Sequence, residues 1–162
     1  MNIIRLTKAE VDCAAPLAAA FRVTLKSYKG IAAKADLSAG KAELLEYLEA
    51  NFPVFLAMEQ EICVGYLVCR IEKPTVWVES IYVTEPYRRK GVASALFQQA
   101  ENLAASFGEQ TVFNYVHPNN YGMIAFLKKH GYTVLNLIEI RKPYPNEKLS
   151  EQIQVGPNLF NY

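Results

Sequence analysis

A strand that leads through a basic, glycine-containing turn into a helix occupies the middle of this sequence. Residues 76–83 are mostly β-branched and aromatic, which predicts a strand. A turn at Glu85-Pro86 follows, and then the basic run Arg88-Arg89-Lys90 and Gly91. Over residues 92–103 apolar side chains recur at helical spacing. The chain is therefore expected to fold around a strand–turn–helix unit with a cationic turn.

The start of the predicted helix is suited to hold a phosphate group. The first backbone N–H groups of a helix have no partner within the helix, and the helix dipole adds positive charge there. Gly91 and Ala93 place no bulky side chain between these groups and a ligand. The turn has neither the Gly-x4-Gly-Lys-Ser/Thr pattern of a P-loop nor the GxGxxG pattern of a dinucleotide site. A cationic turn without a ligand has the same residues, so that alternative stays open.

A second motif lies at residues 119–132, with the sequence NNYGMIAFLKKHGY. Asparagine before an apolar helical pattern and glycine after it predict a capped helix over residues 119–130, closed by Gly131. Local physics explains this pattern without a ligand, because helix caps alone favour these residues. The motif gains significance only through its order after the basic turn.

The rest of the chain predicts helices and strands in the order βαα, βββ and αβαβ. A mixed sheet follows, antiparallel early and with a parallel crossover late, so the fold class is α/β. Thr7 and Glu10 fit a capping box at the start of the first helix. The remaining expected strands are residues 2–6, 54–58, 62–71, 111–116 and 132–140, and the expected helices are residues 7–27, 38–52 and 91–107.

The two motifs together resemble the GNAT family of N-acetyltransferases over about residues 54–141. The turn Arg88-x-x-Gly91-x-Ala93 is similar to the pyrophosphate loop of that family, and Asn120 with Gly131-Tyr132 is similar to its later motif. The resemblance implies a mostly antiparallel central sheet flanked by helices. It also implies acetyl-CoA as cosubstrate, no metal, and direct transfer of the acetyl group to a primary amine of a small molecule, peptide or protein.

The resemblance also implies where acetyl-CoA binds. The two strands on either side of the pantetheine arm are expected to separate, which leaves backbone groups of Ile81 and Val83 for its amides. The diphosphate is expected at the turn and at the start of the helix. The predicted cofactor-binding residues are Ile81, Tyr82, Val83, Arg88, Arg89, Lys90, Gly91, Val92, Ala93, Ser94 and Asn120.

Glu79 is the predicted base, because it is a carboxylate in an otherwise apolar strand and matches a family position. The alternative is a solvent-facing carboxylate, or one paired with Arg70 across a hairpin. The resemblance puts the usual acid tyrosine at Leu127, which cannot donate a proton. Tyr121 is the preferred replacement and Tyr115 the second choice, with His117 also nearby; unaided departure of the thiolate stays open.

A single transferase domain is expected over residues 1–141, with a tail over residues 142–162 that could be a docking arm. The aromatic residues of the tail favour packing on its own or a partner subunit, hence a homodimer. Three cysteines without metal-ligand spacing favour a cytoplasmic protein, and the net charge of +1 gives no reason to expect nucleic-acid binding. No apolar stretch is long enough for a membrane span.

A second function of a different class is consistent with the same residues. A non-catalytic sensor or scaffold that binds acyl-CoA would keep the basic turn, and the leucine at position 127 favours it. A general nucleotide-binding protein is disfavoured, because no magnesium ligand accompanies the turn. The sequence does not identify the acceptor amine, since residues 28–37 lack the acidic cluster of a polyamine site.

Overall fold

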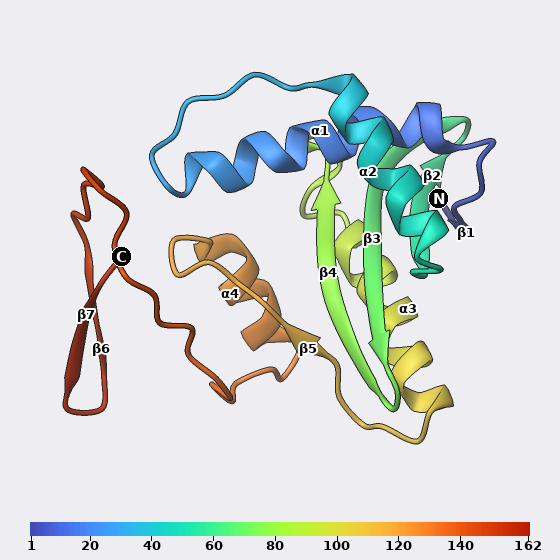
Figure 1. Ribbon diagram of the computed structural model, residues 1–162. Helices are drawn as coiled ribbons and strands as arrows, with labels where there is room; N and C mark the ends of the chain where they lie inside the picture. Colours follow the sequence, from blue (N-terminus) through green and yellow to red (C-terminus); the bar gives the residue numbers. More distant parts are fainter. The chain divides into compact units, whose positions relative to one another are not determined.

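Five strands form the central sheet in the computed structural model, which describes all residues 1–162. Their order is β1-β2-β3-β4-β5 (Figure 1). The chain divides into two compact units, residues 1–125 and 126–162, and the sheet belongs to the first. The elements of the first unit are β1 (Asn2–Arg5), α1 (Val11–Ser27), α2 (Leu37–Glu49), β2 (Val54–Glu59), β3 (Ile62–Glu72), β4 (Thr75–Val83), the 3₁₀ turn η1 (Glu85–Tyr87), α3 (Val92–Ser106) and β5 (Phe113–Asn114).

The sheet is antiparallel from β1 to β4 and parallel between β4 and β5. Short turns join β2, β3 and β4, while α3 makes the crossover that the parallel pair requires. The predicted meander, the late crossover and the mixed α/β fold class are therefore confirmed.

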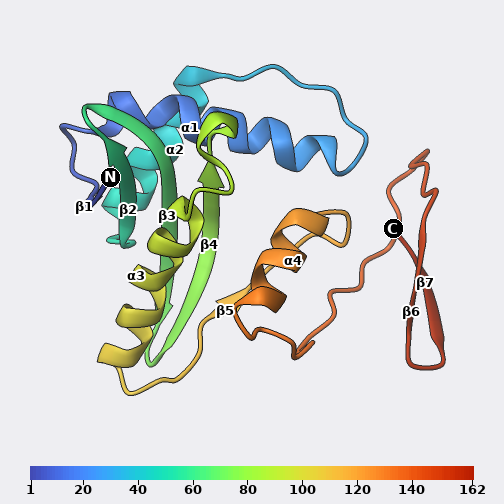
Figure 2. The same ribbon diagram turned by 180° about the vertical axis from the view of Figure 1, so that it is seen from behind.

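Helices cover both faces of the sheet. Helices α1 and α2 lie on one face and α3 lies on the other, as the two opposite views show (Figures 1 and 2). Tyr66 of β3 is fully buried below α1, with its ring centroid 6.2 Å from that of Phe21. Gly65, next to it, leaves little room for a side chain, because a Cβ there would lie 3.0 Å from the Tyr82 carbonyl oxygen. The meander thus packs tightly at the segment that leads to the basic turn.

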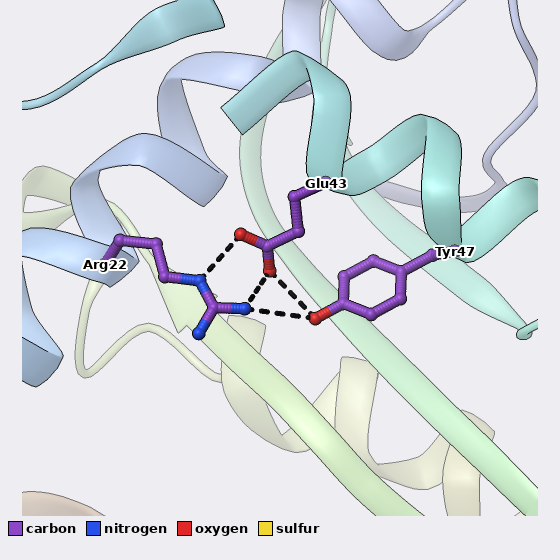
Figure 3. Close-up of polar contacts among 3 residues, drawn as sticks. All are labelled: Arg22, Glu43 and Tyr47. Atoms are coloured by element: carbon purple, nitrogen blue, oxygen red, sulfur yellow. Dashed lines mark hydrogen bonds and ion pairs between the residues drawn. The ribbon is translucent and has the colours of Figure 1, made fainter. Parts of the chain in front are cut away.

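A polar network joins α1 to α2 (Figure 3). The Arg22 guanidinium donates to both carboxylate oxygens of Glu43, with its Nε 2.6 Å from Oε2. The Tyr47 hydroxyl donates to Glu43 at 2.8 Å, and Arg22 donates to Tyr47 at 3.3 Å. Burial, followed by the bond to Glu43, raises the pKa of Tyr47 to about 12. The network holds α2 against α1, the two helices that the loop at residues 28–36 connects.

The first helix begins later than its sequence predicts. Glu10 accepts from the Thr7 backbone N–H at 2.9 Å and from the Thr7 hydroxyl at 2.6 Å, while the Ala9 N–H donates to that hydroxyl at 3.2 Å. Thr7 therefore caps a separate turn, and the regular helix starts at Val11. The prediction of Thr7 as the N-cap of α1 was wrong, although its interaction with Glu10 is present.

Two predicted strands differ in the structure. The strand expected over residues 111–116 is reduced to Phe113–Asn114, because β4 pairs with β5 only at Trp77 and Val78. The strand expected over residues 132–140 is absent, and its apolar side chains are largely exposed. A β-prone sequence becomes a strand only when a neighbouring strand supplies the hydrogen-bond ladder, and no strand pairs with these residues.

The second unit begins within helix α4 (Tyr121–Lys129) and ends in a hairpin of β6 (Gln152–Val155) and β7 (Asn158–Asn161). Part of the C-terminal tail is thus ordered as a two-stranded hairpin. The division of the chain into residues 1–141 and 142–162, and the docking role of the tail, remain predictions. No helix of the protein is both long and apolar enough to cross a membrane.

Candidate functional site

The turn between β4 and α3 has the backbone form expected of an anion site. Arg89 and Gly91 both have left-handed φ angles, +61° and +83°. Two left-handed residues so close together turn the backbone sharply just before α3. Helix α3 begins at Val92, and the Ala95 N–H donates to the Gly91 carbonyl oxygen at 3.0 Å. The N–H groups of Val92 and Ala93 precede this bond and belong to the first, positively polarised turn of the helix.

The basic side chains of this turn have separate roles. The Arg88 Nε donates to the Val83 carbonyl oxygen at 2.9 Å, and the guanidinium carbon lies 5.6 Å from the Tyr82 ring centroid. Arg88 is therefore held against the end of β4. Lys90 lies 5.4 Å from the centroid of the Tyr87 ring, and Arg89 is exposed. All three cations of the turn are exposed, and Arg89 and Lys90 are the two that no hydrogen bond holds against β4.

One edge of β4 is unpaired beyond Val78. The register of β4 with β5 contains only Trp77 opposite Phe113 and Val78 opposite Asn114. The Thr84 N–H donates to the Val64 carbonyl oxygen on the β3 side, so the alternation of the strand directs the backbone groups of Val83 and Ile81 to the opposite edge. These are the two residues whose backbone the sequence assigned to the pantetheine arm.

Glu79 is the extra residue of a β-bulge. Val68 of β3 pairs with Ser80 and Cys69 pairs with Val78, so Glu79 has no partner in the register. Its carboxylate lies 3.4 Å from the Arg70 Nε, and 36% of its side chain is exposed. Arg70 also forms an ion pair with Glu72. The alternative expected from the sequence, a carboxylate paired with Arg70 and facing solvent, is thus the arrangement in the free protein.

An aromatic cluster joins β3, β4 and β5 beside Glu79. We define the Trp77 cluster as Arg70, Trp77, Phe113 and Tyr115. The Trp77 ring stacks on Tyr115 with centroids 4.8 Å apart and an interplanar angle of 9°, and its centroid lies 5.0 Å from that of Phe113. The Arg70 guanidinium carbon is 5.5 Å from the Trp77 centroid. Through Arg70 and Trp77 the cluster links Glu79 to Tyr115.

Sequence reasoning did not identify the Trp77 cluster. A usable signal existed: Phe113 and Tyr115 lie two residues apart, so they share one face of a strand. What the sequence did not supply was the register that sets Trp77 opposite Phe113. Two polar atoms at these pairs, Trp77 Nε1 and Asn114 Oδ1, are buried without a hydrogen-bond partner. A buried polar group without a partner is costly, so these two atoms call for an explanation such as a bound water or ligand.

The second motif caps its helix as local physics predicts. The Asn120 Oδ1 accepts from the Met123 N–H at 3.1 Å. Tyr121, the first residue of α4, is 69% exposed, and Leu127 is buried. Neither the capping role of Asn120 nor the exposure of Tyr121 assigns them a ligand. Their roles in cofactor binding and in acid catalysis remain predictions.

His117 fastens the loop before α4 to the end of α1. Its ring stacks on Tyr28 with centroids 6.0 Å apart, and its Nδ1 accepts from the Asn119 N–H at 3.1 Å. The Asn119 side chain donates to the Tyr28 carbonyl oxygen at 3.0 Å. Burial, and then the charge of Lys29, lower the pKa of His117. The imidazole is therefore neutral at neutral pH and has a structural role in this loop.

The residues of this region fit a diphosphate and an extended amide chain. The turn supplies left-handed backbone and exposed cations, and the unpaired edge of β4 supplies backbone donors and acceptors. No group of three or more His, Cys, Asp or Glu side chains is arranged to hold a metal ion. The arrangement suits a ligand that combines phosphate groups with amides, with a carboxylate and aromatic rings beside it.

The sequence matches the model of a known family and one curated relative. Residues 21–132 match the model of the acetyltransferase (GNAT) family. The sequence is 31% identical over 100 residues to the probable N-acetyltransferase san of Drosophila melanogaster, covering 59% of this chain and 54% of the relative. The chain therefore spans about half the length of that curated relative.

Solved structures share the fold at low sequence identity. The aminoglycoside acetyltransferase AAC(6')-Iy, in complex with a bisubstrate analogue of CoA and acetylneamine, superposes with a TM-score of 0.66 and 18% identity over 89% of this chain and 98% of that one. A ribosomal-protein-alanine N-acetyltransferase from Brucella melitensis biovar Abortus 2308 superposes with a TM-score of 0.69 and 16% identity over 88% and 99% of the two chains. These similarities establish the fold alone.

Proposed function

Because the chain belongs to the GNAT family of acetyltransferases, we propose that it transfers an acetyl group from acetyl-CoA directly to a primary amine in a ternary complex. The observation that carries this proposal is the turn with Gly91 at φ +83°, set beside the unpaired edge of β4. Together they offer the two features that acetyl-CoA needs, an anion site and backbone groups at a strand edge, of which the Val83 carbonyl oxygen accepts from Arg88 in the free protein.

In this proposal the turn and the strand edge hold different parts of acetyl-CoA. The N–H groups from Arg89 to Ser94 and the charges of Arg89 and Lys90 bind the diphosphate. Backbone groups of Ile81 and Val83 bind the pantetheine amides, and an N–H there polarises the thioester carbonyl. Arg88 stabilises this end of β4 through its bond to Val83 and its contact with Tyr82.

Glu79 and Tyr115 are the proposed base and acid. An alkylammonium has a pKa of about 10.4, so the acceptor must lose a proton before it attacks. Glu79 accepts that proton, through a water molecule, and Arg70 holds its carboxylate in position. Tyr115 protonates the departing thiolate. We prefer Tyr115 to Tyr121 because only Tyr115 belongs to the Trp77 cluster beside Glu79.

The acceptor is a primary amine of a small molecule or of a peptide. The names of the structural neighbours include an aminoglycoside 6'-N-acetyltransferase and a ribosomal-protein-alanine N-acetyltransferase. Both kinds of amine therefore belong in a test. A screen should contain aminoglycosides, peptides with free N-termini, lysine side chains and small metabolite amines.

The alternative is a non-catalytic acyl-CoA sensor, favoured by the leucine at position 127. The release of free coenzyme A in the presence of each amine separates the two functions. We expect at least one amine to raise the release well above that with acetyl-CoA alone. Binding of acetyl-CoA without stimulated release by any amine would favour the sensor.

Acetyl-CoA should raise the melting temperature of the protein. At about 100 times the dissociation constant, binding to the native state stabilises it by about 2.7 kcal/mol, or roughly 5–10 °C for a chain of this size. NAD, which has a diphosphate but no pantetheine arm, should produce little change. Thermal unfolding with each ligand measures the difference, and equal stabilisation by NAD would contradict binding along β4.

A further inference from the structure

Two cysteines that the proposed reaction does not use line the same cavity. Cys13 is in the first turn of α1 and is exposed, while Cys63 is the second residue of β3 and is buried. Cys63 belongs to the same core cluster as Val11 and Ala14, the residues around Cys13 on α1. Elements separated by 50 positions in the sequence thus bring the two side chains together.

Both thiols line one cavity of about 420 Å³. Its other lining residues are Pro16, Leu17, Ala20, Glu61, Ile62 and Thr84. The Cys13 Sγ donates to the Glu10 carbonyl oxygen at 3.1 Å, and the Cys63 Sγ donates to the Gly65 carbonyl oxygen at 3.7 Å. Neither sulfur is in a disulfide, and only Cys13 is exposed to a reagent in solution, because Cys63 is buried.

Each thiol affects the pKa of the other. Burial, and then the charge of Cys13, raise the pKa of Cys63 to about 12. Burial raises the pKa of Cys13, while a hydrogen bond with the Cys63 side chain lowers it. Such mutual effects act over a few ångströms.

From this juxtaposition we infer that Cys13 and Cys63 are a covalent modification site, which a low-molecular-weight disulfide oxidises to an intramolecular disulfide. The Cys13 thiolate attacks one sulfur of the reagent and releases one reagent thiol. The Cys63 thiolate then attacks the Cys13 sulfur of the mixed disulfide and releases the second. Two protein thiols are oxidised, the reagent disulfide is reduced to two thiols, and the two protons pass to those thiols.

The bond joins the first turn of α1 to the start of β3, and so closes a loop of about 50 residues in the unfolded chain. Cross-linking of this kind stabilises the native state by restricting the unfolded one. We expect oxidation to raise the melting temperature on the order of 5–10 °C. Thr84, which lines the same cavity, leads directly into the turn before α3, so the bond forms next to that segment.

The test is to incubate the reduced protein with oxidised glutathione and to map its peptides by mass spectrometry. We expect a linked pair of peptides containing Cys13 and Cys63, and loss of two of the three free thiols. The matched variants are Cys13→Ser, which should lose the linkage and the thermal shift, and Cys69→Ala, which should keep both. Cys13 is exposed, so its replacement by serine leaves the core unchanged and the test does not depend on a folding defect.

The pH dependence gives an independent readout. Because both pKa values are raised, thiolate is scarce at pH 7, and the rate should rise about tenfold per pH unit up to the thiol pKa. Glu10 and Asp12 raise the pKa of Cys13 further, Lys41 of α2 forms an ion pair with Asp12 at 2.6 Å, and Glu61 lines the cavity. A stable mixed disulfide on Cys13, a linkage to Cys69, or three unchanged thiols at pH 9 would each overturn the inference.

Discussion

Replacement of Gly91 by valine is expected to abolish tight binding of acetyl-CoA while the protein remains folded. Gly91 has a φ of +83°, and a Cβ built there meets no atom of the protein within 4 Å. A side chain would therefore project into open space in the free protein, and into the diphosphate in the proposed complex. We expect the dissociation constant to rise by about a hundredfold or more, equivalent to roughly 2.7 kcal/mol.

The valine also strains the backbone, and a matched control separates this effect from the loss of binding. Left-handed φ costs a β-branched residue on the order of 1–3 kcal/mol, which a domain with about 5–15 kcal/mol of stability tolerates. Gly108, at the other end of α3, has a φ of +84° and equally open surroundings. Gly108→Val should therefore lose similar stability but bind acetyl-CoA normally. Calorimetric titration and thermal unfolding of both variants measure this, and equal affinities would show that Gly91 does not border the diphosphate.

Tyr115→Phe lowers kcat by about a hundredfold, the usual effect of a lost general acid. Phenylalanine keeps the ring that stacks on Trp77 and removes only the hydroxyl, so the Trp77 cluster stays intact. Binding of both substrates should hardly change, which would appear as a fall in kcat at constant KM. The measurement is steady-state turnover with saturating acetyl-CoA and the best amine of the screen.

Tyr121→Phe is the matched control, because it removes the same atom from a tyrosine at the start of α4. We expect its turnover to stay within about threefold of the wild type. Leu127→Ala should alter activity only through packing, since leucine has no proton to give. If both phenylalanine variants turn over like the wild type, neither tyrosine is the acid, and the thiolate departs without help from the protein.

The preference between Tyr115 and Tyr121 shows which parts of a site can be predicted by counting residues along a sequence. Helical spacing placed Tyr121 in the first turn of α4, and the structure agrees. The position of Tyr115 depends on which residue of β5 pairs with Trp77, and the register is a property of the assembled sheet. The meander and the helix after the basic turn were predictable because their patterns are local. The bulge at Glu79 and the Trp77 cluster were not, because each arises from pairing between strands.

The strand predicted at residues 132–140 is absent for the same reason, because strand formation depends on pairing with another strand. Its alternation of apolar residues is typical of a strand, yet the property that makes a strand is a partner. The length of β5 was overestimated for a related reason, since the ladder with β4 stops where the register changes. In both places the residues favour strand structure, and pairing within the sheet determined whether a strand formed.

Because of the bulge, Glu79 has two separate roles, one for its side chain and one for its backbone. Its carboxylate is the proposed base, while its backbone is the extra residue between the pairs at Val78 and Ser80. Substitution of Glu79 alters only the role of the side chain, because a substituted residue leaves the number of residues in β4 unchanged. Deletion of Glu79 would instead restore a regular ladder and remove the bend that a bulge gives a strand. Insertions and deletions near this position therefore reshape this edge of β4 in a way that no series of substitutions there can reproduce.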